Sequence, residues 1–125
     1  MKLDRLLDDV NVATIAFAET GSEVVLGFLT MTDGTAAGSL VCTGLLVFKY
    51  QCLPDGGLPV YAGEVNQAVV SGDEARSLLQ RLGYDFKGAG ADVPGSEAPR
   101  LRYVCLEGGL RLEIVCTDIL FRPGV

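Results

Sequence analysis

Hydrophobic residues recur at a helical interval over the first ten positions. Leu3, Leu6, Leu7 and Val10 stand at positions i, i+3, i+4 and i+7, with charged residues between them. This spacing predicts a short amphipathic helix over residues 2–9. The stripe could continue to about residue 18, but β-branched and aromatic residues favour a strand over 12–18. Both a strand and a helix therefore stay open for residues 11–18.

The next part of the chain alternates between apolar stretches and turn residues. Residues 23–32 are almost all Val, Leu, Phe and Thr and end at Asp33-Gly34, which predicts a strand and a turn. Even positions are apolar over 40–52, which predicts one long strand with one buried face. A turn at 54–57 and a returning strand at 59–70 follow. We therefore expect an antiparallel meander.

A second helix is predicted over residues 72–82. Ser71 and Glu74 have the spacing of a capping box, in which each side chain bonds a free backbone N–H at the helix start. An apolar stripe follows, and Gly83 stands where a C-terminal cap belongs. Residues 87–99 are rich in Gly, Ala, Pro and Ser without periodicity, and we expect a mobile surface loop there.

A closing hairpin is expected around Gly108-Gly109. If these two glycines form a two-residue turn, Cys105 lies opposite Leu112 and Tyr103 opposite Ile114 on one face. The predicted fold is therefore α+β, a single domain over residues 1–125. It has a single antiparallel sheet of about six strands, a meander plus a C-terminal hairpin, with two helices on one face.

Composition excludes several classes of protein. The chain is 49% hydrophobic and 21% charged with a formal charge of −6, which predicts a folded, globular protein. Charged residues interrupt the N-terminal stretch, and the longest uncharged run, over 34–48, is shorter than the ~18–20 residues of a membrane helix. We expect a cytoplasmic protein without a membrane partner. Because basic residues never cluster in this acidic chain, we expect no nucleic-acid partner.

Four cysteines occur without the spacing of a metal site. There is no C-x-x-C motif, and the chain contains no histidine. We therefore expect no metal or other cofactor, and free thiols in a reducing compartment. Cys105 and Cys116 lie too far apart along the predicted hairpin for a disulfide, as do Cys42 and Cys52 along one strand. Cross-pairing of Cys42 or Cys52 with the hairpin remains open.

The absence of histidine also removes the usual catalytic groups. A Ser-His or Cys-His nucleophile pair is excluded by composition. Glu64, near Asn66, and Asp118, within an apolar run, could act as acid or base if they pointed inward. Positions on an exposed face or near a strand end are favoured for both carboxylates. We therefore predict that the protein is not an enzyme.

Aromatic and basic residues on the strands instead suggest an interface. Tyr50, Tyr61, Tyr103 and Arg102 belong to types enriched in protein interfaces. Two small helices can hardly cover both faces of a sheet whose strands are apolar on both sides. We therefore predict that one sheet face or edge is covered by another copy, a partner or a ligand.

The leading hypothesis for function is a non-enzymatic protein-interaction domain that self-associates as a homo-oligomer. It would act as an adaptor, an inhibitor or an immunity-like module; the chain resembles small bacterial immunity and adaptor proteins at the level of fold class. The rival is a ligand-binding or carboxylate-dependent enzyme domain. Its pocket on a curved sheet would be lined by Phe48, Tyr50, Tyr61, Glu64 and Tyr103.

Overall fold

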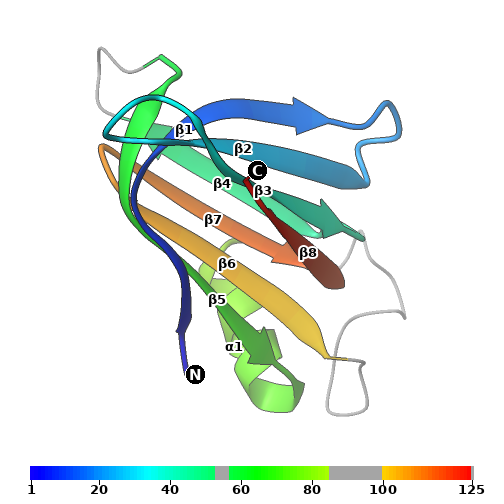
Figure 1. Ribbon diagram of the computed structural model, residues 1–125. Helices are drawn as coiled ribbons and strands as arrows, with labels where there is room; N and C mark the ends of the chain where they lie inside the picture. Colours follow the sequence, from blue (N-terminus) through cyan, green and yellow to red (C-terminus); the bar gives the residue numbers. More distant parts are fainter. Residues whose placement is uncertain (53–56, 85–99, 125) are drawn as a thin grey trace.

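A computed structural model describes residues 1–52, 57–84 and 100–124 (Figure 1). The elements, in chain order, are β1 (Asp4–Phe17), β2 (Glu23–Thr30), β3 (Ala36–Thr43), β4 (Val47–Cys52), β5 (Val60–Val70), α1 (Gly72–Arg81), β6 (Leu101–Gly108), β7 (Leu110–Cys116) and β8 (Asp118–Pro123). The prediction of about six strands and two helices is wrong. Within the described residues the fold is one eight-stranded antiparallel sheet with one short helix. Most of the turn predicted at 54–57, and the loop predicted over 87–99, lie outside the described residues.

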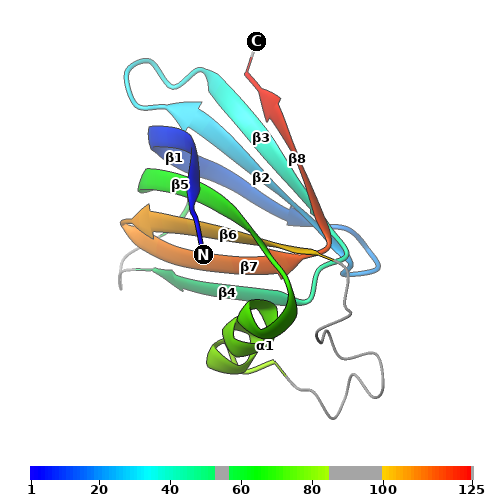
Figure 2. The same cartoon turned by 90° about the horizontal axis from the view of Figure 1, so that it is seen from below.

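The sheet coils so that its two ends meet at one corner. The strand order is β4-β7-β6-β5-β1-β2-β3-β8, yet only residues 44–46 join β3 to β4, and Thr117 alone joins β7 to β8. Backbone hydrogen bonds close this corner, from Thr117 N–H to Thr43 O (3.0 Å) and from Leu46 N–H to Val115 O (2.8 Å). In Figure 2 the strands fan out from the side of this corner. The predicted long strand over 40–52 is therefore two strands in different parts of the sheet.

Gly44 makes the corner possible. Its φ of +64° lies in the left-handed region, which residues with a Cβ rarely adopt. A Cβ at this position would also fall 2.0 Å from Thr117 Oγ1. The close approach of the two connections therefore requires glycine.

The N-terminal segment is a strand, which contradicts the predicted helix over residues 2–9. β1 pairs with both β2 and β5, and the open question over 11–18 resolves as strand through Phe17. Leu7 and Val10 both face the core although they are three residues apart, because Asp9 between them has a positive φ of 48°. A strand with such irregularities spaces its inward residues like a helix. The sequence pattern therefore imitated an amphipathic helix.

The coiled sheet encloses the main core on its inner face. The buried residues of this core are Val10, Val12, Val24, Leu26, Phe28, Leu40, Cys42, Val60, Ala62, Val65, Val104, Leu106, Leu110, Leu112, Ile114 and Cys116. A second core lies on the outer face, where Leu78 and Leu79 of α1 pack with Val70, Tyr103 and Val115. Among the described residues, the helix therefore covers one part of the outer face, and no other element covers the rest of it (Figure 2).

Helix α1 confirms the predicted helix over 72–82 within a residue. Ser71 is its N-cap residue, but its side chain makes no capping hydrogen bond, so the predicted capping box is not formed. Gly83 follows the helix with a φ of +80° and donates its N–H to Gln80 O (3.1 Å). The apolar stripe and the C-terminal glycine therefore fix this helix without the box.

The closing hairpin is shifted by one residue from the predicted register. Leu106 lies opposite Leu112 and Tyr103 opposite Val115. Strand β5, which pairs with β6 of the hairpin, sets this register, because Gly109 N–H donates to Tyr61 O of β5 (2.8 Å). A shift of one residue changes which side chains oppose each other across a pair. In the observed register, apolar residues oppose each other on the inner face.

Candidate functional site

The residues proposed for a pocket lie on opposite faces of the sheet. Phe48 and Tyr50 of β4 point inward and pack against the main core. Tyr61 and Glu64 of β5 lie on the outer face, as does Tyr103, which is buried beneath α1. These five side chains therefore do not line one cavity.

Glu64 and Asn66 belong to a charged cluster on the outer face of β1 and β5. Arg5 binds Glu64 Oε1 through Nη2 (2.6 Å) and Asn66 Oδ1 through Nε (3.0 Å), and it also pairs with Asp8. The hydrogen bond that Arg5 donates to Asp8 raises the pKa of Arg5, and the nearby Glu64 charge adds to this. Glu64 is therefore held as the ion-pair partner of Arg5.

Tyr61 lies next to this cluster and remains exposed at 40% of its surface. Its hydroxyl donates to Asp9 Oδ1, and this hydrogen bond is the main reason that its pKa is raised. The aromatic ring is therefore anchored at its tip to β1. It offers a fixed surface rather than a titrating group at neutral pH.

A buried carboxylate, which the sequence reasoning missed, lies between the sheet and α1. Glu113 is only 4% exposed and accepts hydrogen bonds from Tyr103 Oη (2.6 Å), Arg81 Nη2 (2.9 Å) and Arg111 Nε (3.3 Å). Burial opposes its ionisation, but the hydrogen bonds from Tyr103 and Arg81 and the two arginine charges outweigh it and lower the pKa of Glu113. Burial, followed by this hydrogen bond, raises the pKa of Tyr103. The carboxylate is thus fully partnered and ties the helix to the sheet.

A signal for this carboxylate was present in the sequence. Glu113 interrupts the run Leu112 to Cys116, and Arg111 and Glu107 lie nearby on the hairpin. The observed register places Glu107 opposite Arg111, and their side chains form an ion pair of 2.7 Å. In the predicted register Glu113 lies on the face opposite to that of Tyr103, so the contact between these two residues could not be recognised.

Arg102 and Asp118 lie apart from the other nominated residues. Arg102 shares the inner side of β6 with Val104, and its Nη1 donates to Gln67 Oε1 (3.3 Å). Asp118 is exposed at the start of β8, where its Oδ1 accepts the N–H of Ile119 (2.9 Å). The seven nominated residues are therefore distributed over several places, with only Glu64 and Asn66 in one cluster.

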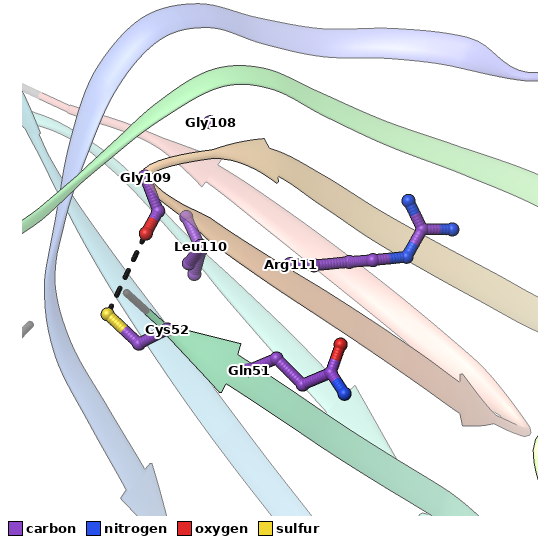
Figure 3. Close-up of a pocket in the computed structure, with 6 residues that line it drawn as sticks. All are labelled: Gln51, Cys52, Gly108, Gly109, Leu110 and Arg111. Atoms are coloured by element: carbon purple, nitrogen blue, oxygen red, sulfur yellow. Dashed lines mark hydrogen bonds between the residues drawn. The ribbon is translucent and has the colours of Figure 1, made fainter. Parts of the chain in front are cut away.

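An open hollow of about 250 Å³ lies where the end of β4 meets the β6–β7 hairpin (Figure 3). Gln51, Cys52, Gly109 and Arg111 are among its lining residues, and Cys52 Sγ donates to Gly109 O (3.7 Å). Arg111 already binds Glu107 and Glu113. Its charge is therefore engaged within the protein.

The four cysteines are free thiols. Cys42 and Cys116 are both buried on the inner face, and their side chains are hydrogen-bonded to each other. This contact, followed by burial, raises the pKa of Cys42. The cross-pairing that the sequence left open is thus a contact between two thiols. Within residues 1–52, 57–84 and 100–124 no group of three potential ligands could hold a metal ion.

The uncovered outer face of β1, β2, β3 and β8 carries a row of apolar side chains. Ala16, Val25, Val41 and Leu120 stand opposite one another across the four strands. Leu120 is 52% exposed and lies on β8, at the end of the strand order. We call these four residues the apolar row. That another copy, a partner or a ligand covers this surface stays a prediction.

Polar residues border the apolar row on both sides. Ser39 and Arg122 stand opposite each other on one side, and Thr43 and Asp118 on the other. The row is therefore a narrow strip that ends at β8, the edge strand of the sheet among the described residues. In the part of the chain that the structure describes, no helix is long and apolar enough to cross a membrane.

Comparisons with known proteins give a family and a fold without an activity. Residues 5–123 match the model of a protein family whose description reads only "-like". No curated protein matches the chain. A crystal structure of an uncharacterised protein from Neisseria gonorrhoeae has a similar fold, with a TM-score of 0.67 and 17% sequence identity. That similarity covers 98% of this chain and 99% of the other.

Proposed function

Because the chain belongs to this "-like" family, whose description names no activity, we propose from its own surfaces that it is a protein-interaction domain. It associates with copies of itself through the uncovered part of the sheet around β8. In the cell it acts as an adaptor, an inhibitor or an immunity-like module. The observation that carries the proposal is the apolar row, which ends at the half-exposed Leu120 on a free strand edge.

The polar groups elsewhere support a binding role over a catalytic one. The carboxylate of Glu64 is paired with Arg5, and that of Glu113 is paired with Arg81 and Arg111. No buried side-chain nitrogen or oxygen in the described part of the chain lacks a hydrogen-bond partner. A catalytic acid or base usually has an environment that brings its pKa toward neutrality. The four free thiols suit a reducing compartment such as the cytoplasm.

The test is the molar mass of the protein in solution as a function of concentration. Sedimentation velocity on the wild type should show a species heavier than the monomer that grows with concentration. Leu120→Glu places a charge at the end of the apolar row and should shift the protein toward the monomer. Leu3→Glu is the matched control, because Leu3 is 48% exposed but lies outside the row. A wild type that stays monomeric, or equal effects of the two variants, would contradict the proposal.

A further inference from the structure

The free edge of β8 carries a side-chain order that is complementary to itself. Asp118, Leu120 and Arg122 alternate along the outer face, while Ile119 and Phe121 pack inward against the main core. We propose that β8 pairs antiparallel with the β8 strand of a second copy, about a two-fold axis at Leu120. This inference rests on the proposed self-association and gives it a register. Asp118 of each copy then lies opposite the partner's Arg122, and the two Leu120 side chains meet at the axis.

The backbone of β8 has groups that face away from β3, as this pairing needs. Gly124 N–H donates to Ala37 O of β3 (3.2 Å). Backbone N–H and C=O groups point to alternate sides along an antiparallel strand. Those of Arg122 and Leu120 then bond to β3, and those of Phe121 and Ile119 point away from β3. The N–H of Ile119 accordingly bonds to the Asp118 carboxylate. In the pair, the Ile119 N–H leaves the Asp118 carboxylate and donates to the backbone oxygen of the partner's Phe121, whose N–H donates to Ile119 O. This exchange releases the Asp118 carboxylate for the partner's Arg122.

Charge and side-chain direction select this register over its neighbours. A shift of two residues moves each Asp118 away from the partner's Arg122 and loses both ion pairs. A shift of one residue places outward side chains opposite inward ones. Arg122 makes no ion pair with any described residue, so its guanidinium is available for the partner. Pro123 lacks an N–H and ends the paired stretch.

The other edge of the sheet lacks this self-complementarity. On β4 the outward residues include Lys49 and Gln51. Pairing two copies about Lys49 would bring two ammonium groups together, which is a common protection of an exposed strand edge. A lone charge of this kind repels a second copy, whereas opposite charges placed symmetrically about Leu120 attract one. The charges on β8 therefore select a second copy as the occupant of that edge.

The pairing extends the apolar row from one copy into the next. Val41 and Leu120 of one copy lie in line with the partner's Leu120, and the outer faces of both sheets lie on the same side. One short strand buries little surface, which places the contact below the standard interface of about 1,600 Å². We therefore expect a reversible dimer with a dissociation constant of about micromolar order.

The test is charge exchange between two variants of the full chain. Asp118→Arg and Arg122→Asp each bring like charges together in a homodimer, and each should raise the dissociation constant about tenfold or more. Mixed together, the two variants should form a heterodimer with near wild-type affinity, because every Arg then faces an Asp. Sedimentation equilibrium measures all three samples, and circular dichroism checks that each variant is folded. Lys49→Asp on β4 is the control and should leave the wild-type dimer unchanged.

The outcomes separate this register from the proposed self-association. A wild type that is monomeric up to about 1 mM, the weak end of specific binding, overturns both. A wild-type dimer that tolerates both single variants, or a mixture that fails to recover affinity, overturns the β8 register alone. Asp118→Arg also removes the acceptor of the Ile119 N–H. If that variant does not fold, Leu120→Lys replaces it, and it must dissociate the dimer by placing two ammonium groups at the axis.

Discussion

Replacing Glu113 by Gln should destabilise the protein because its carboxylate connects α1 to β7. The wild-type side chain is 5% exposed and accepts hydrogen bonds from Tyr103 and two arginines. A hydrogen bond to a charged group contributes about 1.5–3 kcal/mol, and breaking a fully buried ion pair costs about 3–5 kcal/mol. The side chains of Arg81 and Arg111 are 52% and 47% exposed, so water can solvate these arginines after the change. We therefore expect a loss of about 2 kcal/mol in the free energy of unfolding.

The loss should depend on pH in a direction set by the lowered pKa of Glu113. Burial opposes ionisation, but the hydrogen bonds and arginine charges prevail, so the folded carboxyl titrates below its unfolded value of about 4.3. The stabilisation is complete above that unfolded value and disappears as the pH falls through the folded pKa. Wild type and Glu113→Gln should therefore differ fully at pH 7 and converge in acid.

Urea unfolding followed by circular dichroism measures this difference at both pH values. Glu64→Gln is the matched control, because Glu64 pairs with Arg5 at 2.6 Å but its side chain is 44% exposed. An exposed pair contributes about 0–1 kcal/mol. Equal losses for the two variants, or a Glu113→Gln loss that persists at low pH, would refute the reasoning.

Three further changes test the packing, the corner and the thiols. Leu79→Ala, at a fully buried site on the sheet-facing side of α1, should cost about 2–5 kcal/mol in urea unfolding. Leu3→Ala, at a half-exposed site, should cost about 0.5 kcal/mol or less. Gly21→Ala, in open space at positive φ, should cost about 1–2 kcal/mol in the free energy of unfolding. Gly44→Ala should cost more, because its Cβ would also meet the Thr117 hydroxyl. Equal losses for the two variants would contradict the tight corner. Ellman's reagent should label one thiol rapidly in the folded protein, and Cys52→Ser should abolish this phase, because Cys52 is the cysteine that is only partly buried.

Local sequence signals predicted the elements that local interactions determine. Helix α1 lies within a residue of its prediction, because an apolar stripe and a terminal glycine suffice to define a helix. Strand β1 was predicted as a helix in its first part, because Asp9 in a left-handed conformation shifts the alternation of inward residues. A single sequence shows the spacing of residues but not the backbone conformation that produces it.

Long-range pairing explains what the sequence could not predict. The hairpin register depends on the bond between Gly109 and Tyr61, and residues far apart in the chain form the β3–β8 ladder. The apolar excess predicted that another copy, a partner or a ligand covers one sheet face or edge, and this stays a prediction. Leu120, the exposed end of the apolar row, was not identified. Its exposure follows from the place of β8 at the end of the strand order.

The corner between the two ends of the sheet has a consequence for cooperativity. The segments β3–β4 and β7–β8 each run through it from one end of the strand order to the other. Opening either end of the sheet at this corner would therefore also break the backbone hydrogen bonds that close it, which couples the two ends. Native-state hydrogen exchange should accordingly give one common opening free energy for amides in the centres of β2 and β6. The protein should unfold as a single cooperative unit.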